Sequence, residues 1–487
     1  MNKPIRAVSI FCLLLFVALM INATYLQFWA ADDLNNRPDN ARATEAAFSR
    51  ERGDILVGRK AIATSVDSHD RYKYLRRYTE PYLYAPITGY LQLNSQTGLE
   101  RSQNEILSGE DPRLFVNRLV DLVRNESNKG GNVSLTIDPD AQEAAYQSLE
   151  QAVGPDGEGA VVAIEPKTGK ILAMTSYPTY NPNQLATHDF SAAGENYKRL
   201  SNDDHEPLLN RAIQTRLFPG STFKMVTAAA ALDTGLYTED DMVPSGATYQ
   251  PNGVGNVIDN EGRYQCDPAK VSFATAMEFS CNTAFARMAV ELGEDRLRAT
   301  AEAFGFNSDD YFDDLPATAE SVFPTEDLED TFVAQTGFGQ YTVQATPLQM
   351  AMVAAAIANN GTLMKPKLID EIQSADYETL QPFEPEELQH DAISPKAAEQ
   401  VTDLMVDTVN SGTASPAAIP GVEVAGKTGT AQRGSGLPPY AWFTSFAPAG
   451  DAKVAVAVMI QSAPGKEIAG GLLGGPVAKA VMEAVLQ

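Results

Sequence analysis

The sequence has few of the residues that most often serve in metal sites and catalytic triads: four histidines and three cysteines in 487 residues. No His-Glu-x-x-His motif occurs, and the histidines lack metal-ligand spacing: His69, His188, His205 and His390. Metal catalysis is therefore not expected, and a Ser-His-Asp triad would have few histidines available. No cofactor is predicted.

Basic residues are also scarce, because 37 Lys and Arg residues stand against 63 Asp and Glu residues, which gives a net charge of −26 at pH 7. Binding to nucleic acid relies on clustered cations that release counterions, so a nucleic-acid partner is not expected. The chain is nevertheless 44% hydrophobic, which is ample for packed cores. We expect a globular protein of two or more domains.

Only one uncharged apolar run is long enough to cross a bilayer as a helix, from Ala7 to Ala31. Lys3 and Arg6 precede this run, and aspartates 32–33 follow it. Cytoplasmic flanks carry the excess of positive charge, so the N-terminus is predicted in the cytoplasm and the rest of the chain outside. Residues 1–31 are therefore predicted to be a cytoplasmic tip and a single-pass membrane anchor.

A cleaved signal peptide is the alternative for this run, but the apolar core is followed by no clear small-x-small site. Asn22–Thr24 is the nearest weak candidate. An uncleaved anchor is favoured. The other long apolar run, around Leu348 to Ile357, is rich in alanine and flanked by Pro347, so it is predicted to be a core helix.

Residues 32–155 mix short strand-like pieces with polar turns and are predicted to form a small, irregular α+β domain. Two of its turns are marked by glycine, Arg52–Asp54 and Thr97–Glu100, and are predicted to be solvated loops. After a helical pattern from Ala141 to Val153, the loop at Gly154–Gly157 is predicted to end the domain.

Residues 156–487 are predicted to form helices packed against an antiparallel sheet, an α+β arrangement. An early strand pair and three late strands should share that sheet and bring the first and last elements together. The expected strands are Ala160–Ile164, Ile171–Met174, Gly421–Thr430, Trp442–Phe446 and Val454–Ile460, with a closing helix at Val477–Leu486.

Ser221 and Lys224 stand at the start of a helix that continues through an alanine-rich stretch. One helical turn places the Lys224 amine on the same face as the Ser221 hydroxyl, within reach for proton transfer. A lysine can serve as this base only where burial or a second cation lowers its pKa from about 10.4. A Ser-x-x-Lys sequence is common, so other motifs are needed to give it meaning.

Two further motifs follow in order behind the membrane anchor. Ser280 and Asn282 form Ser-x-Asn in a stretch, Phe273–Ala289, that is predicted to be helical. Lys427 opens a Lys-Thr-Gly motif on a late strand. Each piece is weak alone, but the ordered triplet indicates a serine acyl-transfer site.

Cys12 lies in the predicted membrane span, which leaves Cys266 and Cys281 in an oxidising compartment. A disulfide between them would hold the loop that precedes the Ser280 segment. The alternative is two unpaired thiols, one of them buried.

With these motifs, residues 155–487 resemble the penicillin-binding family of serine acyltransferases. The resemblance implies a serine β-lactamase and transpeptidase-like fold and a peptidoglycan D,D-transpeptidase activity. The shorter N-terminal part is similar to the non-catalytic, pedestal or dimerisation domain of the class B members, on Arg52–Gly53 and Thr97–Glu100.

The resemblance also implies a role for each motif residue. Ser221 would attack the carbonyl between two D-alanines of a stem peptide, and Lys224 would accept its proton. Lys427 would disfavour protonation of Lys224 and attract the substrate carboxylate. Ser280 would relay a proton to the leaving D-alanine, and Asn282 would hold Lys224 and the substrate amide.

Substrate recognition would fall to the strand that carries Lys427. The hydroxyls of Thr428 and Thr430 would bind the substrate carboxylate, and Gly429 would let substrate lie along the strand edge. The backbone N–H groups of Ser221 and Thr430 would form an oxyanion hole.

Three other activities fit the same motifs less well. A β-lactamase needs a deacylating carboxylate, and no Glu-x-x-Leu-Asn stretch lies between residues 282 and 427. A D,D-carboxypeptidase differs only in the acceptor, and a β-lactam sensor or scaffold would not need every catalytic residue type. The implied partners are peptidoglycan stem peptides, β-lactam antibiotics, a polytopic glycan polymerase and other division proteins.

Overall fold

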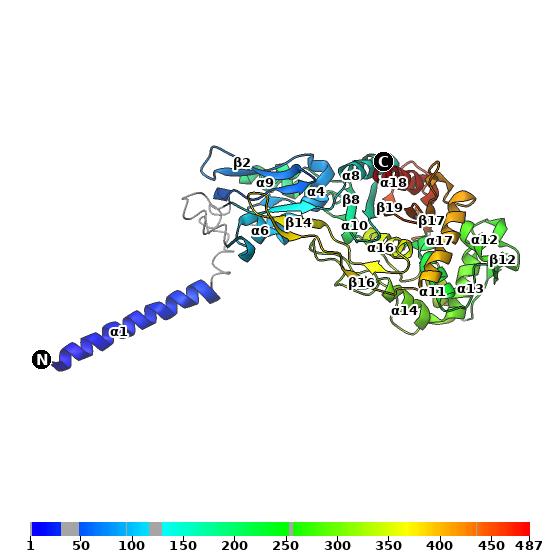
Figure 1. Cartoon of the computed structure of the whole chain (residues 1–487), viewed down its shortest axis with the longest axis horizontal. Helices are drawn as coiled ribbons and strands as arrows, with labels where there is room; N and C mark the ends of the chain where they lie inside the picture. Colours follow the sequence, from blue (N-terminus) through cyan, green and yellow to red (C-terminus); the bar gives the residue numbers. More distant parts are fainter. Residues whose placement is uncertain (1, 31–47, 94, 116–128, 253–256, 435) are drawn as a thin grey trace.

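The computed structural model describes residues 2–30, 48–93, 95–115, 129–252, 257–434 and 436–487 (Figure 1). The aspartates 32–33, on which the predicted membrane orientation depends, lie outside this set. Helix α1 spans Asn2–Thr24 and continues as one π-helical turn, Tyr25–Trp29. Among the described residues, Lys3–Trp29 is the one helix long and apolar enough to cross a membrane.

A six-stranded sheet forms the core of the N-terminal part, in the order β15-β14-β6-β1-β2-β3. Two of its strands come from late in the chain, and Figure 1 shows β14 beside the blue N-terminal elements. The N-terminal sheet is therefore completed by a segment that follows the catalytic motifs Ser221-x-x-Lys224 and Ser280-x-Asn282. The strands are β1 Ile55–Val57, β2 Lys60–Asp67, β3 Tyr74–Tyr78, β6 Asn132–Leu135, β14 Ile369–Gln373 and β15 Thr379–Pro382.

The two glycine-marked turns of this part meet in a buried ion cluster. The Glu100 carboxylate is fully buried and accepts hydrogen bonds from Arg52 Nη2 at 2.9 Å and Arg76 Nε at 2.6 Å. Tyr78 donates to the same carboxylate at 3.2 Å. The prediction of solvated loops is wrong here, because opposite charges that lie far apart in the sequence form ion pairs and are buried together.

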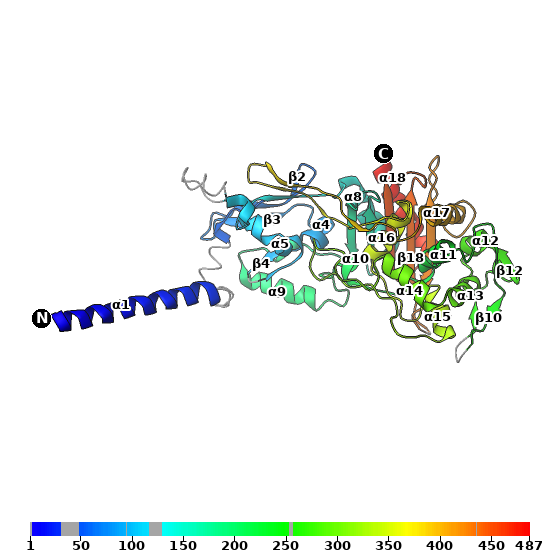
Figure 2. The same cartoon turned by 60° about the horizontal axis from the view of Figure 1, so that its bottom comes forward.

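A five-stranded antiparallel sheet, β17-β18-β19-β7-β8, forms the second core. Strand β19 pairs with β7, so the first and last strands of this part meet as predicted. Helices α8 and α18 cover one face, where Figures 1 and 2 both place them together, and α16 covers the other. The strands are β7 Glu158–Ile164, β8 Ile171–Tyr177, β17 Ala425–Ala431, β18 Tyr440–Ala447 and β19 Val454–Ser462, and the helices α8 Pro139–Val153, α16 Pro347–Ala358 and α18 Gly475–Leu486.

Because helices cover both faces, the central strands are apolar over most of their length, as in residues 454–460 of β19. In β7, Val161 and Ala163 face α8 and α18, whereas Ala160 and Val162 face α16. The alanine-rich helix α16 is buried along almost its whole length, which confirms the predicted core helix.

The motif residues lie where α11 Lys224–Asp233, α12 Phe273–Glu278, α13 Asn282–Leu292 and α17 Pro395–Asn410 pack beside β17. Strand β17 is the edge strand of the sheet, so it can be approached from the side away from β18. The remaining elements are α4 Pro81–Thr88, α5 Gly98–Ser102, α6 Asn104–Ser108, α9 Phe190–Ser201, α10 Arg211–Gln214, α14 Glu294–Ala303, α15 Asp330–Thr336, β4 Leu91–Gln92, β5 Ser95–Gln96, β9 Met242–Pro244, β10 Thr248–Tyr249, β11 Ile258–Asp259, β12 Lys270–Ser272, β13 Leu363–Met364 and β16 Glu387–Gln389.

Candidate active site

Ser221 lies in a single 3₁₀ turn, Gly220–Phe223, that leads directly into α11. The predicted helix therefore begins one turn later, at Lys224. Gly220 has a φ of +53°, and a Cβ there would lie 2.8 Å from the carbonyl oxygen of Thr430. Only glycine fits this approach, which brings the serine turn against strand β17.

Gly429 serves the same approach from the side of the strand. A Cβ on Gly429 would lie 2.9 Å from the carbonyl oxygen of Pro219 and 3.0 Å from Cγ2 of Thr222. The missing side chain thus makes room for the serine turn of the protein itself. From the sequence, Gly429 is interpreted as making room for a bound substrate, and this packing within the protein is not foreseen.

The Lys224 amine is fully buried and makes three hydrogen bonds. Its Nζ donates to the Ser280 carbonyl at 2.8 Å, to the Ser280 hydroxyl at 3.0 Å and to Asn282 Oδ1 at 2.7 Å. Within the described part of the chain, Ser221 is not among these partners. The Ser-x-x-Lys and Ser-x-Asn motifs are therefore joined through the lysine.

The Ser280 segment is a break between helices, whereas the sequence predicts one continuous helix. α12 ends at Glu278 and α13 begins at Asn282. Ser280 has a φ of +55°, a left-handed conformation that costs a non-glycine residue about 1–3 kcal/mol. This conformation lets both its carbonyl and its hydroxyl contact the Lys224 amine.

Lys427 is fully buried on β17, where its Nζ donates to the Thr428 carbonyl at 3.2 Å. Burial, Lys427 and Arg263 together lower the pKa of Lys224 well below its usual value. Burial and then Arg263 lower the pKa of Lys427 in the same way. The Lys224 amine, which faces both of these cations, is therefore poised to lose its proton far more readily than an exposed lysine.

A cleft of about 310 Å³ opens over the serine turn. Thr430 lines it, whereas the Thr428 hydroxyl is hydrogen-bonded to the Thr413 hydroxyl at 2.8 Å. The lining residues are Ser221, Val257, Ile258, Asp259, Glu261, Asn282, Gln335, Phe338, Gln340, Thr430 and Gln432.

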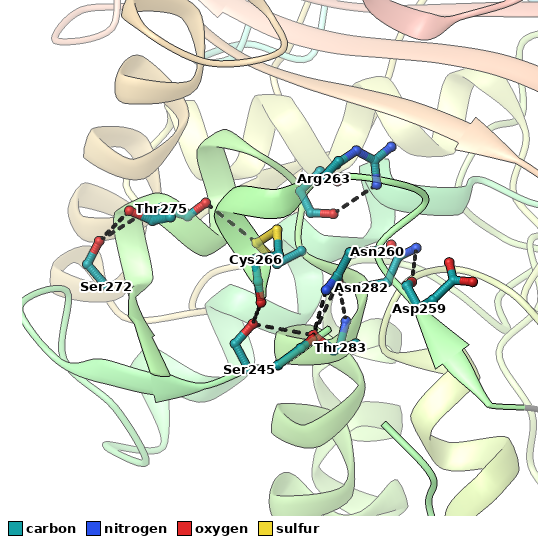
Figure 3. The surroundings of a disulfide bond; sticks show 12 residues. Ser245, Asp259, Asn260, Arg263, Cys266, Ser272, Thr275, Asn282 and Thr283 are labelled. Atoms are coloured by element: carbon teal, nitrogen blue, oxygen red, sulfur yellow. Dashed lines mark hydrogen bonds between the residues drawn. A yellow bond between two sulfur atoms is a disulfide. The ribbon is translucent and has the colours of Figure 1, made fainter. Parts of the chain in front are cut away.

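The structure joins Cys266 and Cys281 in a disulfide, one of the two alternatives open from sequence (Figure 3). The bond ties the 3₁₀ turn Tyr264–Cys266 to the residue between Ser280 and Asn282. A neighbouring hydrogen bond also holds this region: Ser245 Oγ donates to the Cys266 carbonyl at 2.7 Å.

Sequence reasoning missed the charged residues at the edge of this site. Arg263 Nη1 lies 3.4 Å from the Ser280 carbonyl oxygen, and Arg263 Nη2 forms an ion pair with Glu261 at 3.1 Å. Arg263 stands three residues before Cys266, so the predicted disulfide was the one available signal that it lies near Ser280.

Two stretches of the chain match known domain families. Residues 159–483 match the penicillin-binding protein transpeptidase domain, and residues 52–133 match the penicillin-binding protein A dimerisation domain. The peptidoglycan D,D-transpeptidase PbpA of Mycolicibacterium smegmatis is 41% identical over 100% of this chain and 99% of its own. PbpA of Mycobacterium tuberculosis is 40% identical over the same shares.

Solved structures agree with these matches. Penicillin-binding protein A from M. tuberculosis, as a ceftriaxone acyl-enzyme complex, gives a TM-score of 0.86 at 40% identity, covering 91% of this chain and 100% of that chain. Its penicillin G acyl-enzyme complex gives 0.83 at 39% identity, with 90% and 100% covered.

Within class B, a short N-terminal domain of this kind is typical of penicillin-binding protein A of Gram-positive bacteria, and the matches confirm that resemblance. The three motifs, their meeting around Lys224 and the full-length likeness agree with one another. The chain belongs to the class B penicillin-binding proteins.

Proposed function

We propose that this chain is a peptidoglycan D,D-transpeptidase that cross-links stem peptides through an acyl-enzyme on Ser221 and is inhibited by β-lactams. The observation that carries the proposal is the buried Lys224 amine, hydrogen-bonded to Ser280 and Asn282 one turn after Ser221. Its lowered pKa makes the neutral amine, which can act as a base, more accessible than in an exposed lysine.

In the acylation step, the Ser221 hydroxyl oxygen attacks the carbonyl between the two D-alanines as Lys224 accepts the hydroxyl proton. The new ester forms, the peptide bond breaks, and the Ser280 hydroxyl passes a proton to the departing D-alanine amine while it takes one back from protonated Lys224. An acceptor amine then attacks the ester, which forms the cross-linking amide and returns a proton to Ser221. Backbone N–H groups of Ser221 and Thr430 stabilise the oxyanion, each worth roughly 3 kcal/mol.

Asn282, Lys427 and the threonines complete the site in this proposal. Asn282 Oδ1 holds the Lys224 amine, and Asn282 Nδ2 donates to the Asp259 carbonyl at 3.2 Å, which leaves the second N–H of the amide for the substrate peptide. Lys427 adds positive charge beside Lys224 and attracts the substrate carboxylate. Thr430 lines the cleft and supplies a hydroxyl to that carboxylate. Thr428 helps to hold strand β17 in place through the hydrogen bond between its hydroxyl and that of Thr413.

The function is tested with purified protein, a D-Ala-D-Ala donor and an amine-bearing acceptor. Mass spectrometry is expected to show cross-linked dimers, together with a penicilloyl adduct on Ser221 that lasts minutes to hours after penicillin is added. Release of free D-alanine with no dimer at any acceptor concentration would indicate a carboxypeptidase. Rapid turnover of β-lactam would indicate a lactamase.

Lys427→Ala is expected to slow acylation by carboxylate-bearing β-lactams by about 10- to 100-fold, because a charged hydrogen bond contributes about 1.5–3 kcal/mol. A neutral ester of the same compound should be slowed less, since only the effect on Lys224 is lost. Stopped-flow acylation rates on the acid and ester pair measure the difference. Lys453→Ala, at an exposed lysine, is the control, and equal losses on both compounds would make Lys427 purely structural.

We further propose three parts for the chain: a tip and membrane anchor at 1–31, a non-catalytic domain at 32–155 and the transpeptidase domain at 156–487. The apolar helix at Lys3–Trp29 supports a membrane anchor. Lys3 and Arg6 support a cytoplasmic N-terminus and an extracytoplasmic site. A polytopic glycan polymerase and other division proteins are the proposed partners, since cross-linking acts on newly polymerised strands.

A fragment that starts near residue 32 is expected to be soluble without detergent and to bind penicillin as the whole chain does. The reason is that no part of the Lys3–Trp29 helix is buried against the rest of the described chain. Ultracentrifugation and fluorescent-penicillin labelling measure both properties, with the full-length protein in membranes as the control. An insoluble or inactive fragment would contradict the proposed division.

A further inference from the structure

Arg263 reaches the centre of the site although it belongs to none of the three motifs. It flanks the 3₁₀ turn Tyr264–Cys266, and the Cys266–Cys281 disulfide ties that turn to the residue after Ser280. Figure 3 shows Arg263 above the disulfide, on the same side as Asn282. The backbone beside Arg263 is therefore tied by a covalent link to the Ser280 segment.

The Ser280 carbonyl is shared by two basic side chains. Arg263 Nη1 approaches its oxygen at 3.4 Å, and Lys224 Nζ donates to the same oxygen at 2.8 Å. This carbonyl points toward them while Ser280 has a φ of +55°. Two donors on one carbonyl oppose the strain of that conformation and keep the Ser280 hydroxyl against the Lys224 amine.

Arg263 also adds charge to a site that already holds two buried lysines. The charged groups that act on Lys224 are Lys427 from β17, with Arg263 and Glu261 from the loop after β11. Lys427 and Arg263 lower the pKa of Lys224, and Glu261 raises it. A guanidinium stays protonated across the whole physiological range, so its contribution is permanent.

We propose that Arg263 is a positioning residue for acyl transfer: it holds the Ser280 carbonyl through Nη1 and places a permanent positive charge beside Lys224 and Lys427. Glu261 holds the guanidinium through Nη2 and partly offsets its charge. This inference rests on the proposed transpeptidase function, because it concerns the base of that reaction.

The test is the pH dependence of the second-order rate constant for acylation by penicillin G in the full-length protein. Neutral Lys224 is the active form, so the rate rises with pH through the pKa of Lys224. Arg263→Gln removes a positive neighbour and is expected to move this limb upward by about one pH unit, a roughly tenfold loss on the limb in addition to a lower plateau from the lost contact with Ser280. Glu261→Gln is expected to move the limb the other way.

Arg263→Lys should keep the rising limb of the pH profile close to its wild-type position, because the positive charge remains. The rate constant at high pH should be lower than in the wild type, because lysine lacks the planar guanidinium that reaches Ser280. Arg298→Gln, on α14 and paired with Asp295, is the matched control and should leave the profile unchanged. Intact mass verifies the disulfide in every variant.

A uniform loss for Arg263→Gln at all pH values, or limbs that move the same way in the Arg263 and Glu261 variants, would overturn the inference. If Arg263→Gln does not fold, the opposite shift in Glu261→Gln decides alone. Wild-type protein that penicillin G does not acylate would instead overturn the proposed function itself.

Discussion

Ser221→Ala is expected to remove all covalent labelling by penicillin, since in the proposed mechanism the Ser221 hydroxyl oxygen forms the ester. The side chain lines the cleft, so the loss of one oxygen from its wall should change thermal stability little. Labelling with fluorescent penicillin and intact mass measure the adduct, and a thermal melt verifies the fold.

Ser280→Ala is the matched comparison for this result. It removes a second serine hydroxyl from the same site and, in the proposed mechanism, leaves the nucleophile intact while the proton relay is lost. We expect slow but detectable labelling in this variant. A labelled Ser221→Ala protein, with the adduct mapped elsewhere, would overturn the assignment of the nucleophile.

The order of the motifs made the meeting of their residues predictable, because Ser-x-x-Lys, Ser-x-Asn and Lys-Thr-Gly are local patterns with known chemistry. The antiparallel sheet was predictable as well, from apolar strands at both ends of the catalytic part. Lys224 of α11 shows the result: its amine contacts Ser280, in the break before α13, and Asn282, the first residue of α13.

Contacts made by long-range packing could not be predicted in this way. Arg52 and Glu100 each look like a charged residue in a polar turn, and only the fold shows that they pair in the interior. The left-handed Ser280 has no local signal either, since serine rarely adopts that conformation and here tertiary contacts stabilise it. Likewise, no pattern near β14 indicates that it joins a sheet begun by β1 and β6.

Lys224→Arg and Lys224→Ala are expected to slow acylation by about 10²- to 10⁴-fold, the range typical for loss of a general base. The arginine variant retains a cation beside Ser280 and Asn282 but cannot accept a proton near neutral pH, because a guanidinium stays protonated throughout the physiological range. The alanine variant loses both the base and the hydrogen bonds. Stopped-flow acylation by penicillin G measures the rates.

The comparison of the two variants separates a base from a structural cation. If Lys224 only held the Ser280 segment in place, the arginine variant would keep much of its activity and only the alanine variant would fail.

In the wild-type enzyme, the pKa of Lys224 is lowered by burial, Lys427 and Arg263, so the neutral form of the amine appears at a lower pH than in an exposed lysine. The acylation rate should therefore rise with pH and level off before pH reaches the usual lysine pKa of about 10.4. A rate still rising at that pH would mean that the amine is protonated at neutral pH and that another group takes the Ser221 proton.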